Sequence, residues 1–150
     1  MDLVILGDGG DNGLGLLLHG LFAENLAASD GKRRMLAAMS STFGVVAPDV
    51  DVAVTLAFGD GCCRIYDGID RANDAVIHVD CGRIPELSLL SSRCGLPWLY
   101  DEPGQRLVRA LWQRQIRIDG LAPTSLGRAR RSIRAAVDLL RLTRILSVNG

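Results

Sequence analysis

Residues 51–68 read DVAVTLAFGDGCCRIYDG, and they specify a β-hairpin. The larger apolar side chains of residues 50–58 fall on every second position, which is typical of a strand with one buried face. The Gly-Asp-Gly of residues 59–61 tolerates the positive φ angles of a tight antiparallel turn. The chain then runs back through residues 62–66. Because Asp67-Gly68 turns it once more, we expect a twisted meander.

Helical and extended patterns alternate around this hairpin. Leucines at spacings of three and four predict a helix from Leu14 to about Ala28. Ser125 is suited to cap a long C-terminal helix that ends near Ser147, with Ile133, Val137, Leu140 and Arg144 on one side. Residues 2–6 are either a short strand or part of a flexible start over residues 1–13. Further helices are expected at residues 32–40, 83–92 and 103–113, and further strands at 42–46, 75–79 and 115–119.

Length and composition indicate one soluble domain. The chain has 150 residues, of which 48% are hydrophobic, and this is enough for a single core. The order of elements predicts an α/β (α+β) fold with about five strands in a twisted, mixed or antiparallel sheet covered by helices. The net charge is zero but unevenly placed: residues 1–60 carry −5, residues 61–105 carry −3 and residues 106–150 carry +8.

The sequence resembles the sterol carrier protein 2 (SCP2) family of lipid-binding domains over residues 17–148. The resemblance rests on the hairpin, on DAVIHVDCG at residues 74–82 before a leucine-rich segment, on GLPW at residues 95–98 and on RLTRILSV at residues 141–148. It implies a single SCP2-like domain over residues 1–150. It also implies a sheet and helices that enclose an apolar tunnel for a fatty-acyl chain, an acyl-CoA or a sterol. Residues 121–148, rich in arginine, and the glycine-rich start differ from the family pattern, which leaves the ligand open.

Eight apolar residues are candidates for the lining of such a tunnel, because they lie on or beside the helices and the strand that would surround it. The same residues would fill the interior equally well if the core were closed. They are Leu87, Leu90, Leu96, Trp98, Val108, Leu111, Trp112 and Ile118.

Arginines dominate the C-terminal helix and make it cationic and amphipathic. Such a helix lies against anionic lipid head groups, or it is a solvated face that balances acids elsewhere. Nucleic acid is a poorer partner, because the chain has few aromatic side chains for base stacking. The residues assigned to a membrane surface are Arg128, Arg130, Arg131, Arg134, Arg141 and Arg144.

The spacing of the candidate residues does not match the known motifs for cofactor binding, metal binding or catalysis. In the glycine-rich loop of residues 7–13, Asn12 stands where a dinucleotide fingerprint needs its third glycine. The four cysteines lack the paired C-x-x-C spacing of a zinc site, and we expect them to be reduced thiols. His19 lies within a leucine-rich segment and is interpreted as a structural histidine. We therefore expect no cofactor, no metal and no catalytic residue.

These observations favour a non-catalytic protein that binds or carries a lipid in an apolar cavity. No signal peptide or membrane span is visible, so a cytoplasmic protein is expected. The SCP2 resemblance, which extends to bacterial relatives, favours a bacterial protein. The alternative is a structural or accessory module that forms a homodimer or docks on an enzyme.

Overall fold

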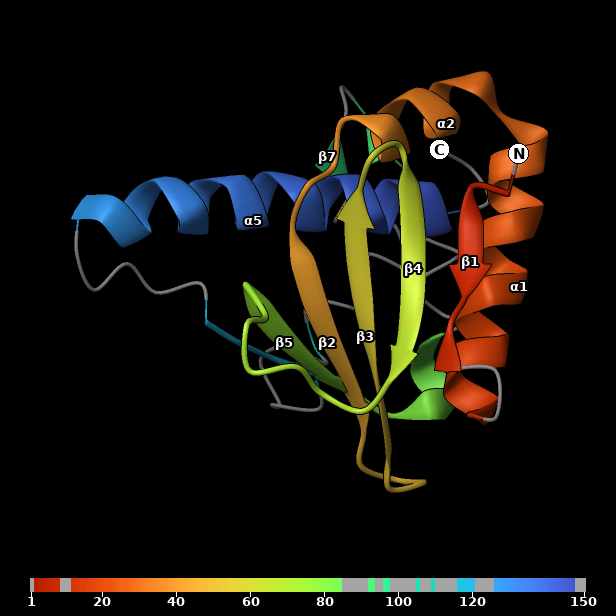
Figure 1. Cartoon of the computed structure of the whole chain (residues 1–150), viewed down its shortest axis with the longest axis vertical. Coiled ribbons are helices and arrows are strands. Elements are labelled where there is room, and N and C mark those ends of the chain that lie inside the picture. Colours follow the sequence, from red (N-terminus) through yellow and green to blue (C-terminus); the bar gives the residue numbers. More distant parts are fainter. Residues whose placement is uncertain are drawn as a thin grey trace.

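A computed structural model describes residues 2–8, 12–84, 92–93, 96–97, 105, 109, 116–120 and 126–147 of the chain (Figure 1). Strands and helices follow one another along the chain, as the α+β prediction requires. In order they are β1 (Val4–Leu6), α1 (Gly13–Ala28), α2 (Asp30–Ala37), β2 (Thr42–Ala47), β3 (Val52–Gly59), β4 (Cys62–Asp67), β5 (Ala75–Val79), the 3₁₀ turn η2 (Cys81–Arg83), β6 (Ser92–Arg93), β7 (Leu96–Pro97), β8 (Ile116–Asp119) and α5 (Leu126–Leu146).

The main sheet is mixed and has six strands in the order β1-β4-β3-β2-β5-β8. β2, β3 and β4 form the antiparallel meander, and Asp60 and Gly61 take positive φ angles of 52° and 79° at the tip of its β3–β4 hairpin. β1 lies parallel to β4, β5 lies parallel to β2, and β8 closes the other edge antiparallel to β5. The fold class is confirmed, with one strand more than expected. β5 does not continue the meander beside β4, because the short N-terminal strand takes that edge.

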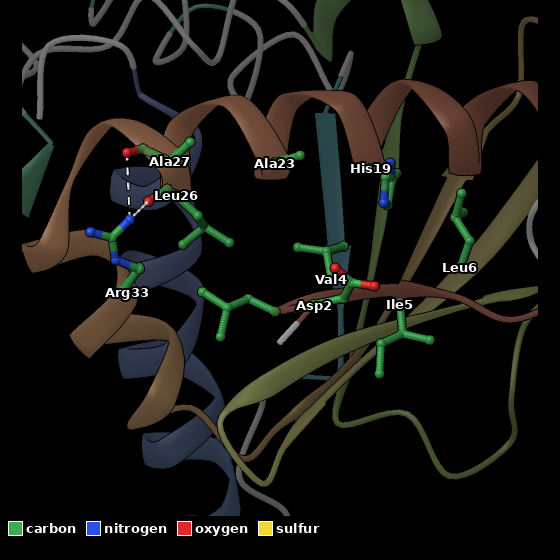
Figure 2. Close-up of a pocket in the computed structure, with 10 residues that line it drawn as sticks. Asp2, Val4, Ile5, Leu6, His19, Ala23, Leu26, Ala27 and Arg33 are labelled. Atoms are coloured by element: carbon green, nitrogen blue, oxygen red, sulfur yellow. Dashed lines mark hydrogen bonds between the residues drawn. The ribbon is translucent and has the colours of Figure 1, made fainter.

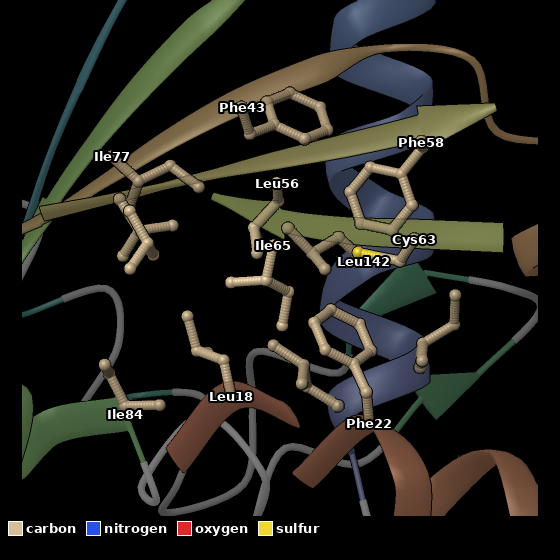
Figure 3. Close-up of a cluster of buried hydrophobic side chains, with 14 of the residues drawn as sticks. Leu18, Phe22, Phe43, Leu56, Phe58, Cys63, Ile65, Ile77, Ile84 and Leu142 are labelled. Carbon is tan, nitrogen blue, oxygen red and sulfur yellow. The ribbon is translucent and has the colours of Figure 1, made fainter. Parts of the chain in front are cut away.

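One face of the sheet carries the hydrophobic core. α5 crosses behind the strands and α1 runs beside β1 (Figure 1). Leu18 and Phe22 of α1 point toward Leu56 and Phe58 of the sheet (Figure 3). The rings of Phe22 and Phe58 lie edge to face with centroids 6.1 Å apart. Such pairs stabilise a core beyond the area that they bury.

Asn12 fixes the start of α1 to the sheet. Its side-chain oxygen accepts a hydrogen bond from the backbone of Leu14 at 2.9 Å, which is the usual helix N-cap. Its amide nitrogen donates to the carbonyl of Ala53 at 3.0 Å and to the carboxylate of Asp67 at 2.8 Å. One side chain therefore caps the helix and ties it to both β3 and β4.

Asp138 attaches α5 to the connection between α2 and β2. Its carboxylate is fully buried and accepts hydrogen bonds from the backbone N–H groups of Ser40 and Ser41, each at 3.1 Å, and from the Ser41 hydroxyl at 2.7 Å. Arg141 completes the set at 2.9 Å and also donates to the carbonyl of Ala38. A buried carboxylate is tolerated because each of these groups is a donor.

We expect Asp138→Ala to lower the free energy of unfolding by about 3–5 kcal/mol, because it leaves buried donors unpaired. Urea unfolding followed by circular dichroism measures the change. Glu24→Ala removes an exposed acid from α1 and should stay within about 0.5 kcal/mol of the parent. Equal effects of the two changes would contradict this role for Asp138.

Lys32, the only lysine, is buried where α1, α2 and the end of α5 meet. Its ammonium donates to the side-chain oxygen of Asn25 at 2.9 Å and to the carbonyl of Ser147. Burial, and to a lesser extent the charge of Arg144, lowers the pKa of Lys32 below its usual 10.5. Both partners are neutral oxygens, so the charge is solvated by dipoles rather than neutralised.

This lowered pKa makes the stability depend on pH. Between the folded-state pKa and 10.5 the unfolded chain binds the extra proton, so the stability contribution of Lys32 rises with pH in that window. We expect the free energy of unfolding of the parent, minus that of Lys32→Met, to increase from neutral pH toward 10.5. Taking the difference removes the titration of other groups. A constant or falling difference in urea unfolding would show that burial does not disfavour the charged amine.

Candidate functional site

A groove of about 550 Å³ lies between α1 and the edge strand β1 (Figure 2). We call it the α1–β1 groove. Seven of its ten lining residues are aliphatic, but about half of the surface that the lining exposes is polar, and Asp2, His19 and Arg33 stand at separate points along it. It is lined by Asp2, Leu3, Val4, Ile5, Leu6, His19, Ala23, Leu26, Ala27 and Arg33.

Small side chains on α1 leave the room for this groove. His19, Ala23 and Ala27 follow one another at four-residue spacing, so they share the side of the helix that faces β1. Alanine fills little of the space between a helix and a strand. A leucine at either alanine position would narrow the groove.

The opposite wall is held in place by backbone hydrogen bonds to β4. The amide of Cys63 donates to the carbonyl of Leu3 at 2.8 Å, and the amide of Gly7 donates to the carbonyl of Ile65 at 2.9 Å. Within the described part of the chain, no strand pairs with the other edge of β1. The β1 wall of the groove is therefore fixed by hydrogen bonds to β4, and its other strand edge has no strand partner among the described residues.

Arg33 marks one end of the groove. Its guanidinium donates to the carbonyl of Leu26 at 2.8 Å at the end of α1, and it also pairs with Asp30. The hydrogen bond that Arg33 donates to Asp30, together with the charge of Arg33, lowers the pKa of the Asp30 carboxyl. The arginine side chain is still 40% exposed, so it can reach the acidic group of a ligand in competition with Asp30 while it caps the end of α1.

Asp2, which precedes β1, and His19 of α1 stand further along the groove on its two sides (Figure 2). His19 is half-buried. The described lining includes no hydroxyl or thiol side chain that could act as a nucleophile. The arrangement can hold a molecule that has an apolar body and a polar end.

The predicted tunnel residues mostly lie outside the described residues: Leu87, Leu90, Trp98, Val108, Leu111 and Trp112. Leu96 lies in β7. Ile118 lies opposite Ile77 in the β5–β8 pair and packs, partly buried, against the core. The described structure brings none of the eight to the α1–β1 groove.

The six arginines assigned to a membrane surface all lie on α5, but they differ in their surroundings. Arg130 and Arg134 are exposed. Arg131 pairs with Asp74, and Arg141 pairs with the buried Asp138. Arg144 is half-buried, and Arg128 lies near the start of the helix. Two of the six therefore have partners in the fold.

A second polar cluster lies on the outer side of the sheet at the β5–β8 pair. Asp119 accepts from Arg117 at 3.0 Å and lies 3.1 Å from the Nε2 atom of His78. Half or more of the Arg117 and Asp119 side chains is exposed, so the pair contributes little to stability. Among the residues that the structure describes, no three His, Cys, Asp or Glu side chains are grouped as a metal site. No helix in that part of the chain is long and apolar enough to cross a membrane.

The described cysteines are free thiols in very different surroundings. Cys63 is fully buried in the core, and burial, with a smaller effect of Cys62, raises the pKa of its thiol. Cys62 is also buried and donates to the carbonyl of Gly59. Cys81 is half-buried, and Cys94 lies outside the described residues.

We expect iodoacetamide to alkylate Cys81 in the folded protein and to reach Cys63 only after unfolding, because the thiolate is the reactive form. Peptide mass spectrometry after a timed reaction measures both sites. Treatment in urea is the control and should label both thiols. Labelling of Cys63 at the rate of Cys81 without urea would contradict the buried environment of Cys63.

No protein-family model matches this sequence, and no curated protein is significantly similar to it. Solved structures with SCP2 domains are among the neighbours of this fold. One is described as UbiJ-SCP2 ubiquinone synthesis protein, with 13% identity, a TM-score of 0.42 and coverage of 75% of this chain and 80% of that one. A crystal structure of sterol carrier protein 2 has 18% identity, a TM-score of 0.41 and coverage of 83% and 92%.

A third similar structure is the stereoselective inverting sec-alkylsulfatase Pisa1 from Pseudomonas sp., with 13% identity and a TM-score of 0.41. There, 67% of this chain corresponds to only 13% of the other. At these identities the similarity concerns the fold alone.

The groove was not predicted from the sequence. The sequence alone predicts a structural role for His19 and leaves residues 2–6 open between a short strand and a flexible start. The available signal was the series His19, Ala23 and Ala27, which puts small residues on one side of a helix that is otherwise rich in leucine. The missing information was that β1 would lie opposite that side.

Proposed function

We propose that this protein binds and carries a lipid with a long apolar chain, of the fatty-acyl, acyl-CoA or sterol-like type, and does not catalyse a reaction on it. The observation that carries the proposal is the α1–β1 groove, which combines aliphatic side chains with a partly exposed arginine at one end. Its volume of about 550 Å³ is within the usual range of small-molecule sites. The sequence resemblance to SCP2 domains supports the same class of ligand.

The chemistry of the groove suits an acidic amphiphile. The hydrocarbon would lie along Val4, Ala23 and Leu26, and the acidic group would meet Arg33. Each methylene removed from water contributes about 0.8 kcal/mol, while association costs about 4–15 kcal/mol. An open groove that covers part of a chain therefore gives modest affinity and allows exchange, as a carrier requires.

A groove-blocking substitution tests this function. Ala23 is exposed on α1 and lines the groove, so Ala23→Phe fills the space without entering the core. We expect its affinity for a dansyl-labelled long-chain fatty acid to fall at least about tenfold, which corresponds to about 1.4 kcal/mol. Fluorescence titration measures the dissociation constant.

Ala37→Phe is the matched control, because Ala37 is an exposed alanine on α2 that does not line the groove. It should bind like the parent. Displacement of the probe by unlabelled acids should strengthen with chain length, up to about fourfold per methylene. Equal binding by both phenylalanine variants would show that the groove is not the lipid site. If displacement did not depend on the chain length of the unlabelled acid, the lipid-binding function itself would be contradicted.

The accessory-module alternative also has an observation in its favour. The free edge of β1, with Ile5 39% exposed beside it, could pair with a strand of another protein or of a second copy. Analytical ultracentrifugation, which measures whether the protein forms a dimer, distinguishes the accessory module from the lipid carrier. A stable dimer of the parent that Ile5→Pro dissociates, without any fatty-acid binding, would favour the accessory module.

A further inference from the structure

α5 has two apolar sides, and only one of them is buried. The inner side carries Ala135, Leu142 and Ile145, which are 0–4% exposed. The outer side carries Ile133, Val137 and Leu140, which are 65%, 41% and 37% exposed. Spacings of four and three residues place the last three in one row, which we call the outer stripe.

Positive charge borders the outer stripe. Arg130 and Arg134 are exposed on the same half of the helix. Arg144 follows Leu140 by four residues, but its side chain is half-buried and its charge acts on the buried Lys32, so the exposed charge beside the stripe is that of Arg130 and Arg134. The only acid of the helix, Asp138, is buried on the inner side and paired with Arg141. No carboxylate of α5 therefore offsets the charge on the outer side.

We infer that the outer stripe docks on an anionic lipid surface. Ile133, Val137 and Leu140 enter the boundary between head groups and acyl chains, and the neighbouring arginines contact lipid phosphates. An interfacial helix has this composition: apolar residues in one row, arginine beside it and no exposed acid.

The charge pattern distinguishes this partner from two others. A second copy of this chain would bring the same arginines together across a symmetric contact, which is repulsive. A nucleic acid would satisfy the arginines but would leave three exposed aliphatic side chains without a partner, and no aromatic residue stands among them for stacking. A bilayer with anionic lipid satisfies both parts of the surface.

The outer stripe lies away from the lipid groove. The first half of α5 extends past β2 on the side of the molecule opposite to α1 and β1 (Figure 1). Arg131, which pairs with Asp74 just before β5, holds this half of the helix to the sheet. Membrane docking and ligand binding can therefore be tested with separate variants.

Vesicle flotation of the full chain provides the test. The parent should bind vesicles of equimolar phosphatidylcholine and phosphatidylglycerol, bind phosphatidylcholine alone much more weakly, and lose binding as salt is raised. The double variant Arg130→Gln with Arg134→Gln should bind the anionic vesicles about 30-fold less tightly. Ile133→Ser should weaken binding about tenfold at unchanged charge and with an unchanged thermal melt.

Arg64→Gln with Arg71→Gln is the matched control, because it removes two exposed arginines that lie elsewhere on the molecule. It should bind like the parent. An equal loss in this control, or equal binding to neutral and anionic vesicles, would overturn the inference. So would parental binding by Ile133→Ser, since the surface would then be a general site for polyanions. Groove variants such as Ala23→Phe should leave flotation unchanged, so failure of one proposal does not imply failure of the other.

Discussion

The orientation of the long C-terminal helix depends on the buried carboxylate of Asp138. Hydrophobic burial alone does not choose which side of α5 meets the core, because Ile133 and Val137 on its outer side are as apolar as Leu142 and Ile145 on its inner side. Only one rotation of the helix brings Asp138 to the N–H groups of Ser40 and Ser41. The other rotation would bury arginines and leave those donors without this acceptor. A polar contact thus determines which apolar side remains on the surface.

The far end of the same helix is held by a second polar contact of the opposite charge. Lys32 reaches from α2 to the carbonyl of Ser147 and to Asn25 of α1. The three described α-helices thereby meet at one ammonium group. A buried lysine without a carboxylate partner is costly. The cost is offset because it fixes three helix ends with one side chain.

Local patterns in the sequence predicted the strands and helices that they themselves contain. The β3–β4 hairpin, β5 and the extent of α1 and α5 follow from alternation, turn residues and leucine spacing. Alternation tells which face of a strand is buried, but it does not tell which strand lies beside it. The sequence therefore did not predict that β1 pairs with β4 or that β5 lies beside β2. The groove was missed for the same reason, since it exists only where β1 faces Ala23 and Ala27.

The helix face shows a related limit of sequence patterns. The sequence shows that Ile133, Val137 and Leu140 lie on one side of the helix, but periodicity does not show whether this row or the row with Leu142 and Ile145 is buried. The hydrogen bond from Ser41 to Asp138 decides this, and Ser41 is nearly a hundred residues away in sequence. A polar residue inside an otherwise amphipathic helix was the usable signal.

The described core also bears on where a lipid can bind. Phe22, Phe43 and Leu56 are 0–1% exposed, and the Phe43 and Phe58 rings lie edge to face at 6.1 Å. Between α1 and the centre of the sheet the space is thus occupied by interlocking side chains, and opening it would cost their packing. Ile118, predicted for the tunnel lining, packs partly buried against the core from the edge strand β8. Among the described residues, space for a hydrocarbon chain exists instead at the margin, where α1 presents alanines rather than phenylalanine to the strand beside it.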